Sequence, residues 1–201
     1  MAVHSKHQID KNNVILIWEI TENENFLVKK AKLGPKCLTM LKSIKSHYKR
    51  KTFLAIRCML IDQNISSDDL FYNEFGKPYL KSGIHISISH TGSFLAIGLS
   101  NNELGVDIER YRTNLNSLAN RFLNNKEKHL ELSDYNILVY WCIKEAVFKM
   151  LNLPKMSFKK IIISETKKNN FVAQYLGKKY VSHQLKCNKF ICVVTQNYIF
   201  N

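Results

Sequence analysis

The stretch Leu104–Glu109, which reads LGVDIE, decides the fold expected for its half of the chain. Apolar residues at positions 104, 106 and 108 alternate with small or acidic residues at 105, 107 and 109, and this period of two predicts a half-buried β-strand. Asp107 and Glu109 therefore project from the same face, roughly 7 Å apart along the backbone. Carboxylates placed in this way can converge on a hard cation that prefers oxygen ligands. The alternative is a solvent-exposed strand face on which Arg110 and Arg112 neutralise both acids.

A second segment, 137–150, is rich in large apolar residues and contains no glycine or proline, which predicts a mostly buried helix. Trp141, Glu145 and Lys149 recur at every fourth position and lie on one stripe of that helix. Because tryptophan is seldom left in water, we expect this stripe to face the interior, where the two charged groups need partners. A metal ion and a phosphate would be such partners. The alternative is an ordinary Glu–Lys pair on a helix surface.

These segments and others along the chain resemble the motifs of the 4′-phosphopantetheinyl transferases, specifically of the surfactin-synthetase-activating type. The motifs occur in the order and at the spacing of that family, from about residue 48 to 150: an arginine-containing helix at 50–57, Gly76-Lys77-Pro78, Ser89-His90-Thr91, the acidic strand at 105–109 and the helical motif at 141–149. Cys142 stands where serine or threonine is usual, and Thr91 replaces a serine. Neither change removes a charged group, so the chemistry implied by the resemblance is retained.

The pattern along the chain predicts strand, helices and strands, and then the same order again, with a junction near Asn101 and Asn102. Strands are expected over 14–20, 84–89, 93–100 and 104–109 and in the segments after Pro154, with helices over 48–62, 115–131 and 136–150. Residues 31–46 are expected to be partly helical and 71–80 to form a loop. The resemblance implies an α+β pseudo-dimer with the active site between its halves: residues 1–101 bind coenzyme A, and residues 102–201 carry the metal site and the catalytic helix.

The resemblance also implies the reaction, that of a holo-[acyl-carrier-protein] synthase. The serine hydroxyl of a carrier protein attacks the β-phosphate of coenzyme A, phosphopantetheine is transferred, and 3′,5′-ADP leaves. Asp107, Glu109 and Glu145 are expected to hold Mg²⁺, although the ligand types suit Mn²⁺ as well. Lys149 would stabilise or protonate the leaving phosphate, and Lys144 is a weaker candidate for phosphate contact. The serine proton can go to Glu109, to Glu145 or to a metal-held water, and the sequence leaves the three open.

Further residues are predicted to bind coenzyme A by their positions in the family motifs. Ser89 and His90 are candidates for the 3′-phosphate of the nucleotide. Lys77, Pro78, Arg50 and Lys51 complete this predicted set. Without the motif, His90 would be a structural histidine, and Lys77-Pro78 would be an ordinary turn.

The stretch between the acidic strand and the catalytic helix is expected, from the resemblance, to help dock the carrier protein. Phe122 and Leu123 would then be exposed and would contact carrier helices, with Arg121 and Lys128 facing acidic residues. The alternative is that Phe122 and Leu123 belong to the core of a helix.

The net charge of +14, from 30 Lys and Arg against 16 Asp and Glu, favours anionic partners. Nucleic acid is the general candidate for such a chain, whereas coenzyme A and an acidic acyl carrier protein are the anions implied by the resemblance. The three acids at 107, 109 and 145 would repel nucleic-acid phosphate in the absence of a metal. A silent relative that only binds carrier protein or coenzyme A is a further alternative, against which the retained acids and Lys149 argue.

The five cysteines are scattered and include no Cys-x-x-Cys pair, so neither zinc nor a disulfide framework is indicated. The apolar run at 14–18 is far too short to span a bilayer, and residues 1–7 show no signal-peptide core. We therefore expect a cytoplasmic enzyme without a membrane segment, and two halves in one chain favour a monomer. Carriers of fatty-acid, polyketide and nonribosomal peptide synthesis all take the same modification, so the sequence does not separate them.

Overall fold

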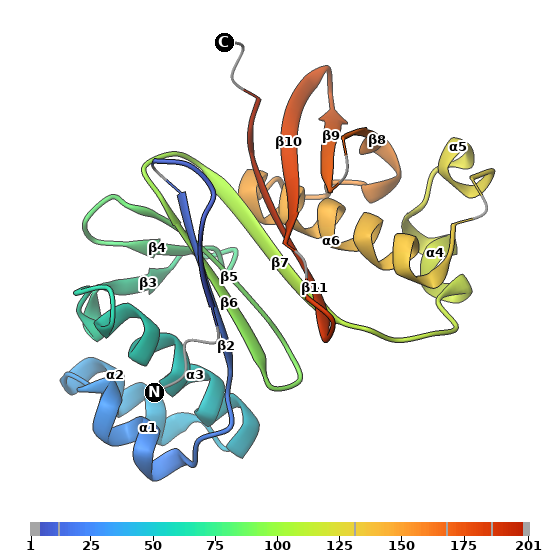
Figure 1. Ribbon diagram of the computed structural model, residues 1–201. Coiled ribbons are helices and arrows are strands. Elements are labelled where there is room, and N and C mark those ends of the chain that lie inside the picture. The colour runs from blue at the N-terminus through green and yellow to red at the C-terminus, as the bar shows by residue number, and fades with distance from the viewer. Residues whose placement is uncertain (1–4, 12, 131, 168, 186, 199–201) are drawn as a thin grey trace. The chain divides into compact units, whose positions relative to one another are not determined.

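The computed structural model describes residues 5–11, 13–130, 132–167, 169–185 and 187–198. The expectation for the first four residues, and that for a helix reaching residue 131, therefore fall in part outside the described chain. The chain divides into two units, Met1–Asn101 and Asn102–Asn201 (Figure 1). Each combines helices with an antiparallel sheet, which confirms the predicted α+β class. The pseudo-dimer and the placement of its active site stay predictions.

The first unit is built on a sheet with the strand order β1-β2-β6-β5, in which β2 pairs with the last strand of the unit. Three helices follow β2, and a short hairpin, β3-β4, precedes β5 (Figure 1). The elements are β1 (Ser5–Gln8), β2 (Asn13–Glu19), α1 (Glu24–Ala31), α2 (Pro35–Ser43), α3 (His47–Ile61), η1 (Ser67–Asp69), β3 (Leu70–Tyr72), β4 (Pro78–Leu80), β5 (His85–Thr91) and β6 (Phe94–Ser100).

Helix α3 is the most buried helix of this unit. The Ser46 hydroxyl accepts a hydrogen bond from the backbone N–H of Lys49 and so caps its first turn. Every residue of 52–60 is buried, so the helix is covered on more than one face. Helix α2 begins at Pro35, since proline at the first helical position loses no hydrogen bond there.

The second unit has the strand order β7-β11-β10-β9-β8, and here too the first strand pairs with the last. The long helix α6 packs against β7 and β11 (Figure 1). The elements are β7 (Leu104–Arg110), α4 (Asn116–Phe122), α5 (Asn125–Lys128), α6 (Asp134–Leu151), η2 (Phe158–Lys160), β8 (Ile162–Lys167), β9 (Asn170–Tyr175), β10 (Lys178–Leu185) and β11 (Phe190–Asn197).

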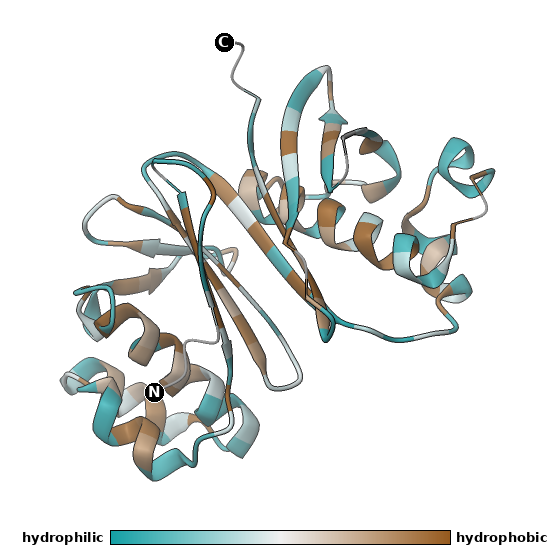
Figure 2. Cartoon of the chain, in the orientation of Figure 1, coloured by the Kyte–Doolittle hydropathy of each residue, from teal (hydrophilic) through white to brown (hydrophobic). Residues whose placement is uncertain are grey.

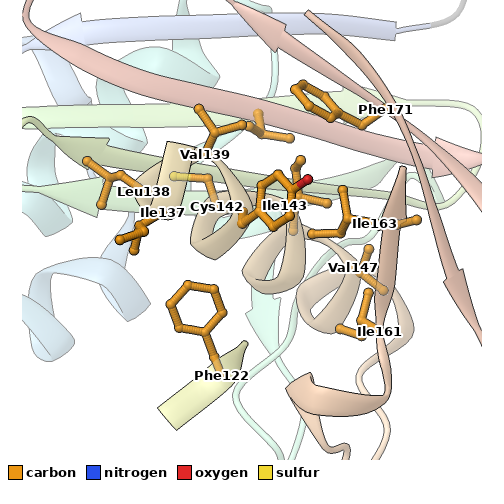
Figure 3. Close-up of a cluster of buried hydrophobic side chains, with 14 of the residues drawn as sticks. Phe122, Ile137, Leu138, Val139, Cys142, Ile143, Val147, Ile161, Ile163 and Phe171 are labelled. Atoms are coloured by element: carbon orange, nitrogen blue, oxygen red, sulfur yellow. The ribbon is translucent and has the colours of Figure 1, made fainter. Parts of the chain in front are cut away.

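The core of the second unit gathers around α6. Figure 3 shows side chains of the helix, such as Ile143 and Val147, beside Ile161, Ile163 and Phe171 from the strand region, and all of these are buried. Fully burying side chains of this size is worth about 1.5–3 kcal/mol each. This cluster therefore fixes α6, and with it the residues that α6 carries, against the sheet.

Strand β7 differs from the half-buried strand that was predicted. Apolar and polar residues do alternate along it, visible as brown and paler or teal bands in Figure 2, but every residue from 104 to 108 is buried. The reason is the close approach of α6: a Cβ added at Gly105 would lie 1.8 Å from the carbonyl oxygen of Ala146. The prediction was wrong because the alternation of the strand does not reveal that a helix covers its acidic face.

Other expectations need smaller corrections. The predicted loop at 71–80 contains the β3-β4 hairpin. Helix α1 lies largely before the segment for which helix was predicted. The predicted helix over 115–131 is two short helices, because Asn124 and Glu127 form a capping box that begins α5. No helix in the described part of the chain is long and apolar enough to cross a bilayer.

Candidate active site

Asp107 and Lys149 form an ion pair between β7 and α6. The Lys149 Nζ atom lies 2.7 Å from Asp107 Oδ1. The Asp107 side chain is 6% exposed and that of Lys149 is 26% exposed, so the carboxylate is buried while its partner reaches the surface. The strand and the helix thus bring together two predicted site residues that lie 42 positions apart in the sequence.

Glu109, further along β7, is held by helix α6 through an aromatic side chain. The Trp141 Nε1–H donates a hydrogen bond of 3.1 Å to Glu109 Oε1. The indole packs against Phe122 and Phe158, with ring centroids 5.3 and 5.5 Å away, which restricts its movement. Trp141 is therefore a positioning residue for Glu109, a role that its place in the motif did not reveal.

Glu145 lies one turn before Lys149 on α6 and is partly buried. The pKa of its carboxyl is raised to about 7, chiefly by burial; the charges of Asp107 and Glu109 also raise it, and Lys149 lowers it. The Glu145 carboxyl therefore interacts electrostatically with both other predicted metal ligands, Asp107 and Glu109. The stripe that it shares with Trp141 and Lys149 is partly exposed, which corrects the expectation that this stripe faces the interior.

The resemblance implies a divalent metal held by Asp107, Glu109 and Glu145, which are called the acidic group below. Three carboxylates supply the hard oxygen ligands that Mg²⁺ or Mn²⁺ prefers, and in chemistry the donor set fits. Across the described residues, however, no three acidic, histidine or cysteine side chains are grouped closely enough to hold a metal ion. Asp107 holds Lys149 instead, so the carboxylates are not gathered on a common point.

The structure does not present Lys144 to a ligand. Its side chain is fully buried, and its Nζ atom forms an ion pair with Glu127 and donates a hydrogen bond of 3.1 Å to the Phe122 carbonyl. Burial lowers the pKa of Lys144, and Glu127 opposes that shift. The predicted phosphate contact therefore has no support in the geometry, because Glu127 and Phe122 already satisfy this cation inside the unit.

The first unit contains a pocket of about 470 Å³ that is lined by two of the predicted coenzyme A residues, Pro78 and His90. The Tyr48 hydroxyl lies 3.0 Å from His90 Nδ1, and the two rings meet edge to face. Tyr48 also lines the pocket. No motif drew attention to Tyr48, since its partner lies 42 residues further along the chain.

The remaining predicted ligand residues of the first unit are placed differently. Ser89 is buried in β5 and Lys77 is partly buried next to Pro78. Arg50 is paired with Glu24 at 2.6 Å, and its Nη1 donates to the Leu41 carbonyl at 2.7 Å. These contacts give Arg50 a structural role. Lys51 borders a separate hollow of about 230 Å³ that it shares with Tyr48.

Phe122 and Leu123, considered for carrier docking, are buried at 1% and 3% exposure. Figure 3 shows the Phe122 ring directed towards α6. Of the two interpretations, the core assignment is therefore correct, and these side chains offer no apolar surface to a partner.

Comparison with known proteins shows which proteins this part of the chain is similar to. Residues 103–198 match the model of the 4′-phosphopantetheinyl transferase superfamily. This stretch contains β7, α6, the three carboxylates at 107, 109 and 145, and Lys149. The match covers just under half of the chain, and it agrees with the resemblance drawn from the motifs.

Two curated relatives agree with that match. The chain is 32% identical over 109 residues to the 4′-phosphopantetheinyl transferase gsp of Aneurinibacillus migulanus, which covers 49% of this chain and 45% of the relative. It is 30% identical over 97 residues to a 4′-phosphopantetheinyl transferase of Bacillus subtilis, covering 42% of this chain and 43% of the relative. Each match thus spans less than half the length of the relative.

Proposed function

We propose that this protein transfers the 4′-phosphopantetheine group of coenzyme A to a serine of an apo acyl or peptidyl carrier protein and releases 3′,5′-ADP. The observation that carries the proposal is the superfamily match over residues 103–198, within which Asp107, Glu109, Glu145 and Lys149 are all retained. Both curated relatives are named 4′-phosphopantetheinyl transferases. These names agree with the family whose motifs the sequence resembles.

In this proposal Asp107, Glu109 and Glu145 hold Mg²⁺, which would supply neutralising charge to the pyrophosphate as its P–O bond breaks. Lys149 pairs with Asp107 at 2.7 Å, so a bound cation and Lys149 compete for one carboxylate. Once released from Asp107, the Lys149 ammonium can stabilise the leaving phosphate. In the absence of substrate, the ion pair with Asp107 therefore holds the Lys149 ammonium beside the site.

Glu145 is a candidate for the base that takes the proton from the carrier serine hydroxyl when its carboxylate is free of the metal. Without a metal its pKa is about 7, raised chiefly by burial, which suits proton transfer at neutral pH. Glu109 is the weaker candidate, because its Oε1 already accepts a hydrogen bond from Trp141. A metal-held water remains the third alternative for this proton.

Coenzyme A is proposed to bind the first unit through the pocket lined by Tyr48, Pro78 and His90. A volume of about 470 Å³ lies within the usual range of small-molecule sites. The pocket combines aromatic and aliphatic walls with Lys49 and His90, a lining that suits a nucleotide with a base and phosphate groups. Arg50 is left out of this site because Glu24 and the Leu41 carbonyl hold it.

The proposal is tested by incubating the purified protein with coenzyme A, Mg²⁺ and a panel of apo carrier proteins, and recording intact masses. One added phosphopantetheine on a carrier serine, prevented by a chelator, is the expected result. Carriers from fatty-acid, polyketide and peptide synthesis belong in one panel, because the range modified separates a dedicated holo-[acyl-carrier-protein] synthase from a broad activator. Coenzyme A binding without transfer to any carrier would instead support a silent binder.

A further inference from the structure

Arg57, on helix α3, is a buried cation without a carboxylate partner. The residue is 1% exposed, and its guanidinium carbon lies 3.5 Å from the centre of the Phe53 ring. Nη1 donates a hydrogen bond of 3.3 Å to the Phe53 carbonyl. Nε and Nη2 are buried and have no hydrogen-bond partner in the described part of the chain, and no described carboxylate pairs with Arg57.

Such an arrangement is costly. A guanidinium stays protonated at any physiological pH, so Arg57 cannot escape the cost of burial by becoming neutral. A buried charge without a counter-charge costs several kcal/mol in real proteins. The carbonyl bond and the aromatic contact offset only part of that cost. A cation left in this state therefore points to a ligand that supplies the missing negative charge.

The position of Arg57 indicates where such a ligand would sit. Arg57 contributes to the wall of the first-unit pocket, together with Tyr72, His90 and the exposed Lys49. Its charge acts on the groups around it: burial raises the pKa of the Tyr72 hydroxyl, and Arg57 opposes that shift. Burial also raises the pKa of the Cys37 thiol; Asp68 raises it further, and Arg57 lowers it through hydrogen bonding and charge. The field of Arg57 thus extends through this part of the unit.

We propose that Arg57 makes this pocket selective for anions, acting through the pocket wall. At 1% exposure the guanidinium needs no direct contact with a ligand, because the low dielectric of the interior carries its field further than water would. This inference rests on the proposed function in one respect: it takes the phosphate groups of coenzyme A as the natural anion. Arg57 is then a specificity-determining residue at the end of the helix motif 50–57, outside the set of residues predicted to bind coenzyme A.

The test compares Arg57→Met with Arg57→Lys and with Lys49→Met, which removes an exposed charge from the same pocket. Binding of 3′,5′-ADP, adenosine and inorganic pyrophosphate is measured by calorimetry at low and high salt. We expect Arg57→Met to weaken 3′,5′-ADP about tenfold and to leave adenosine within about twofold. Arg57→Lys should keep most of the affinity. The loss in Lys49→Met should vanish at high salt and that in Arg57→Met should persist, since buried charges are screened less.

Stability separates this role from a packing role. Because Arg57→Met removes an unpaired buried charge and keeps an apolar stem, its thermal midpoint should equal or exceed that of the unchanged protein. A large fall in the midpoint, failure of this variant and of Arg57→Lys to fold, or equal weakening of 3′,5′-ADP and adenosine would overturn the proposal. The unchanged protein could bind pyrophosphate in an Arg57-dependent manner but neither 3′,5′-ADP nor coenzyme A. That result would support the anion site at Arg57 and contradict coenzyme A as the ligand of this pocket.

Discussion

The main helices of the two units each bury one cation, and the two cations have opposite surroundings. In the second unit, Lys144 on α6 is fully buried against Glu127 and the Phe122 carbonyl. In the first unit, Arg57 on α3 is 1% exposed and lacks any such carboxylate among the described residues. Both helices belong to units in which an early strand pairs with the last. The charge of Lys144 is therefore balanced by Glu127, whereas the charge of Arg57 is not balanced by a described carboxylate.

The difference teaches that burial alone does not identify a functional charge. Lys144 lies inside the family motif and was predicted to bind phosphate, but its partners make it structural. Arg57 lies at the end of the helix motif 50–57, and its Nε and Nη2 have no hydrogen-bond partner among the described residues. The state of hydrogen bonding around each cation, rather than its place in a motif, separates the two roles.

The largest expected effect concerns the acidic group of the second unit. Asp107→Asn removes the charge that pairs with Lys149 and that would hold Mg²⁺, so transfer to a carrier should fall by at least about a thousandfold. The fold should survive, because the amide is isosteric. Initial rates by mass spectrometry, with circular dichroism for folding, provide the measurement. Glu165→Gln, an exposed acid of the same unit, is the matched control. Full activity in Asp107→Asn would remove the metal assignment.

The next effect tests the structural role of Lys144. Lys144→Met leaves Glu127 buried without its cation, which should cost about 3–5 kcal/mol in the free energy of unfolding. Adding Glu127→Gln should restore much of that loss, since the amide is neutral and can still accept the capping hydrogen bond from the Asn124 N–H. Urea titration of the single and double variants measures both. If Lys144→Met proved as stable as the unchanged protein, the contrast with Arg57 would disappear.

A smaller effect is expected at Lys149. Lys149→Met removes the ammonium that stabilises the leaving phosphate, so turnover should fall about a hundredfold. Because it also frees Asp107 from its ion pair, binding of Mn²⁺, followed by electron paramagnetic resonance, should become tighter. Lys178→Met, which removes an exposed lysine, should change neither quantity. Weaker Mn²⁺ binding in Lys149→Met would show that Lys149 and the metal do not compete for Asp107.

The smallest effect lies in the Glu24–Arg50 pair of the first unit. The hydrogen bond from Arg50 lowers the pKa of Glu24 below its ordinary value of 4.5. The pair therefore contributes stability above that value, and the contribution is lost as the pH falls through the lowered pKa of the folded state. Glu24→Gln should cost at most about 1 kcal/mol at pH 7 and nothing at pH 2–3. Unfolding titrations at both pH values measure this. An unchanged difference at low pH would mean that the pair contributes through packing.

Much of the fold followed from local patterns in the sequence. Strand β7 and helix α6 were predicted because their periodicity is strong and uninterrupted, and α3 was predicted to within one residue at each end. What failed depended on other elements. The burial of Asp107 results from α6 covering the strand, and the burial of Arg57 results from α3 being enclosed on several sides. Neither covering element leaves a trace in the pattern of the segment that it covers.

The same limit applies to the candidate site. The motifs placed Asp107, Glu109, Glu145 and Lys149 on two neighbouring elements, and the structure brings these elements into contact. The partners of the predicted residues were not predictable, because each comes from a distant segment: Glu127 for Lys144, Trp141 for Glu109 and Tyr48 for His90. Side-chain pairing of this kind depends on the packed tertiary structure rather than on sequence spacing.

The absence of a side chain at Gly105 determines how closely β7 approaches α6. The Gly105 backbone approaches Ala146 so closely that a methyl group would overlap the Ala146 carbonyl oxygen. The separation of β7 from α6 is therefore set where Gly105 meets Ala146. Gly105 lies two residues before Asp107 on β7, and Ala146 lies one residue after Glu145 on α6. Gly105 therefore sets the distance between the carboxylates of β7 and α6. A larger residue at position 105 would increase the distance between Asp107 and Glu145 without changing either side chain.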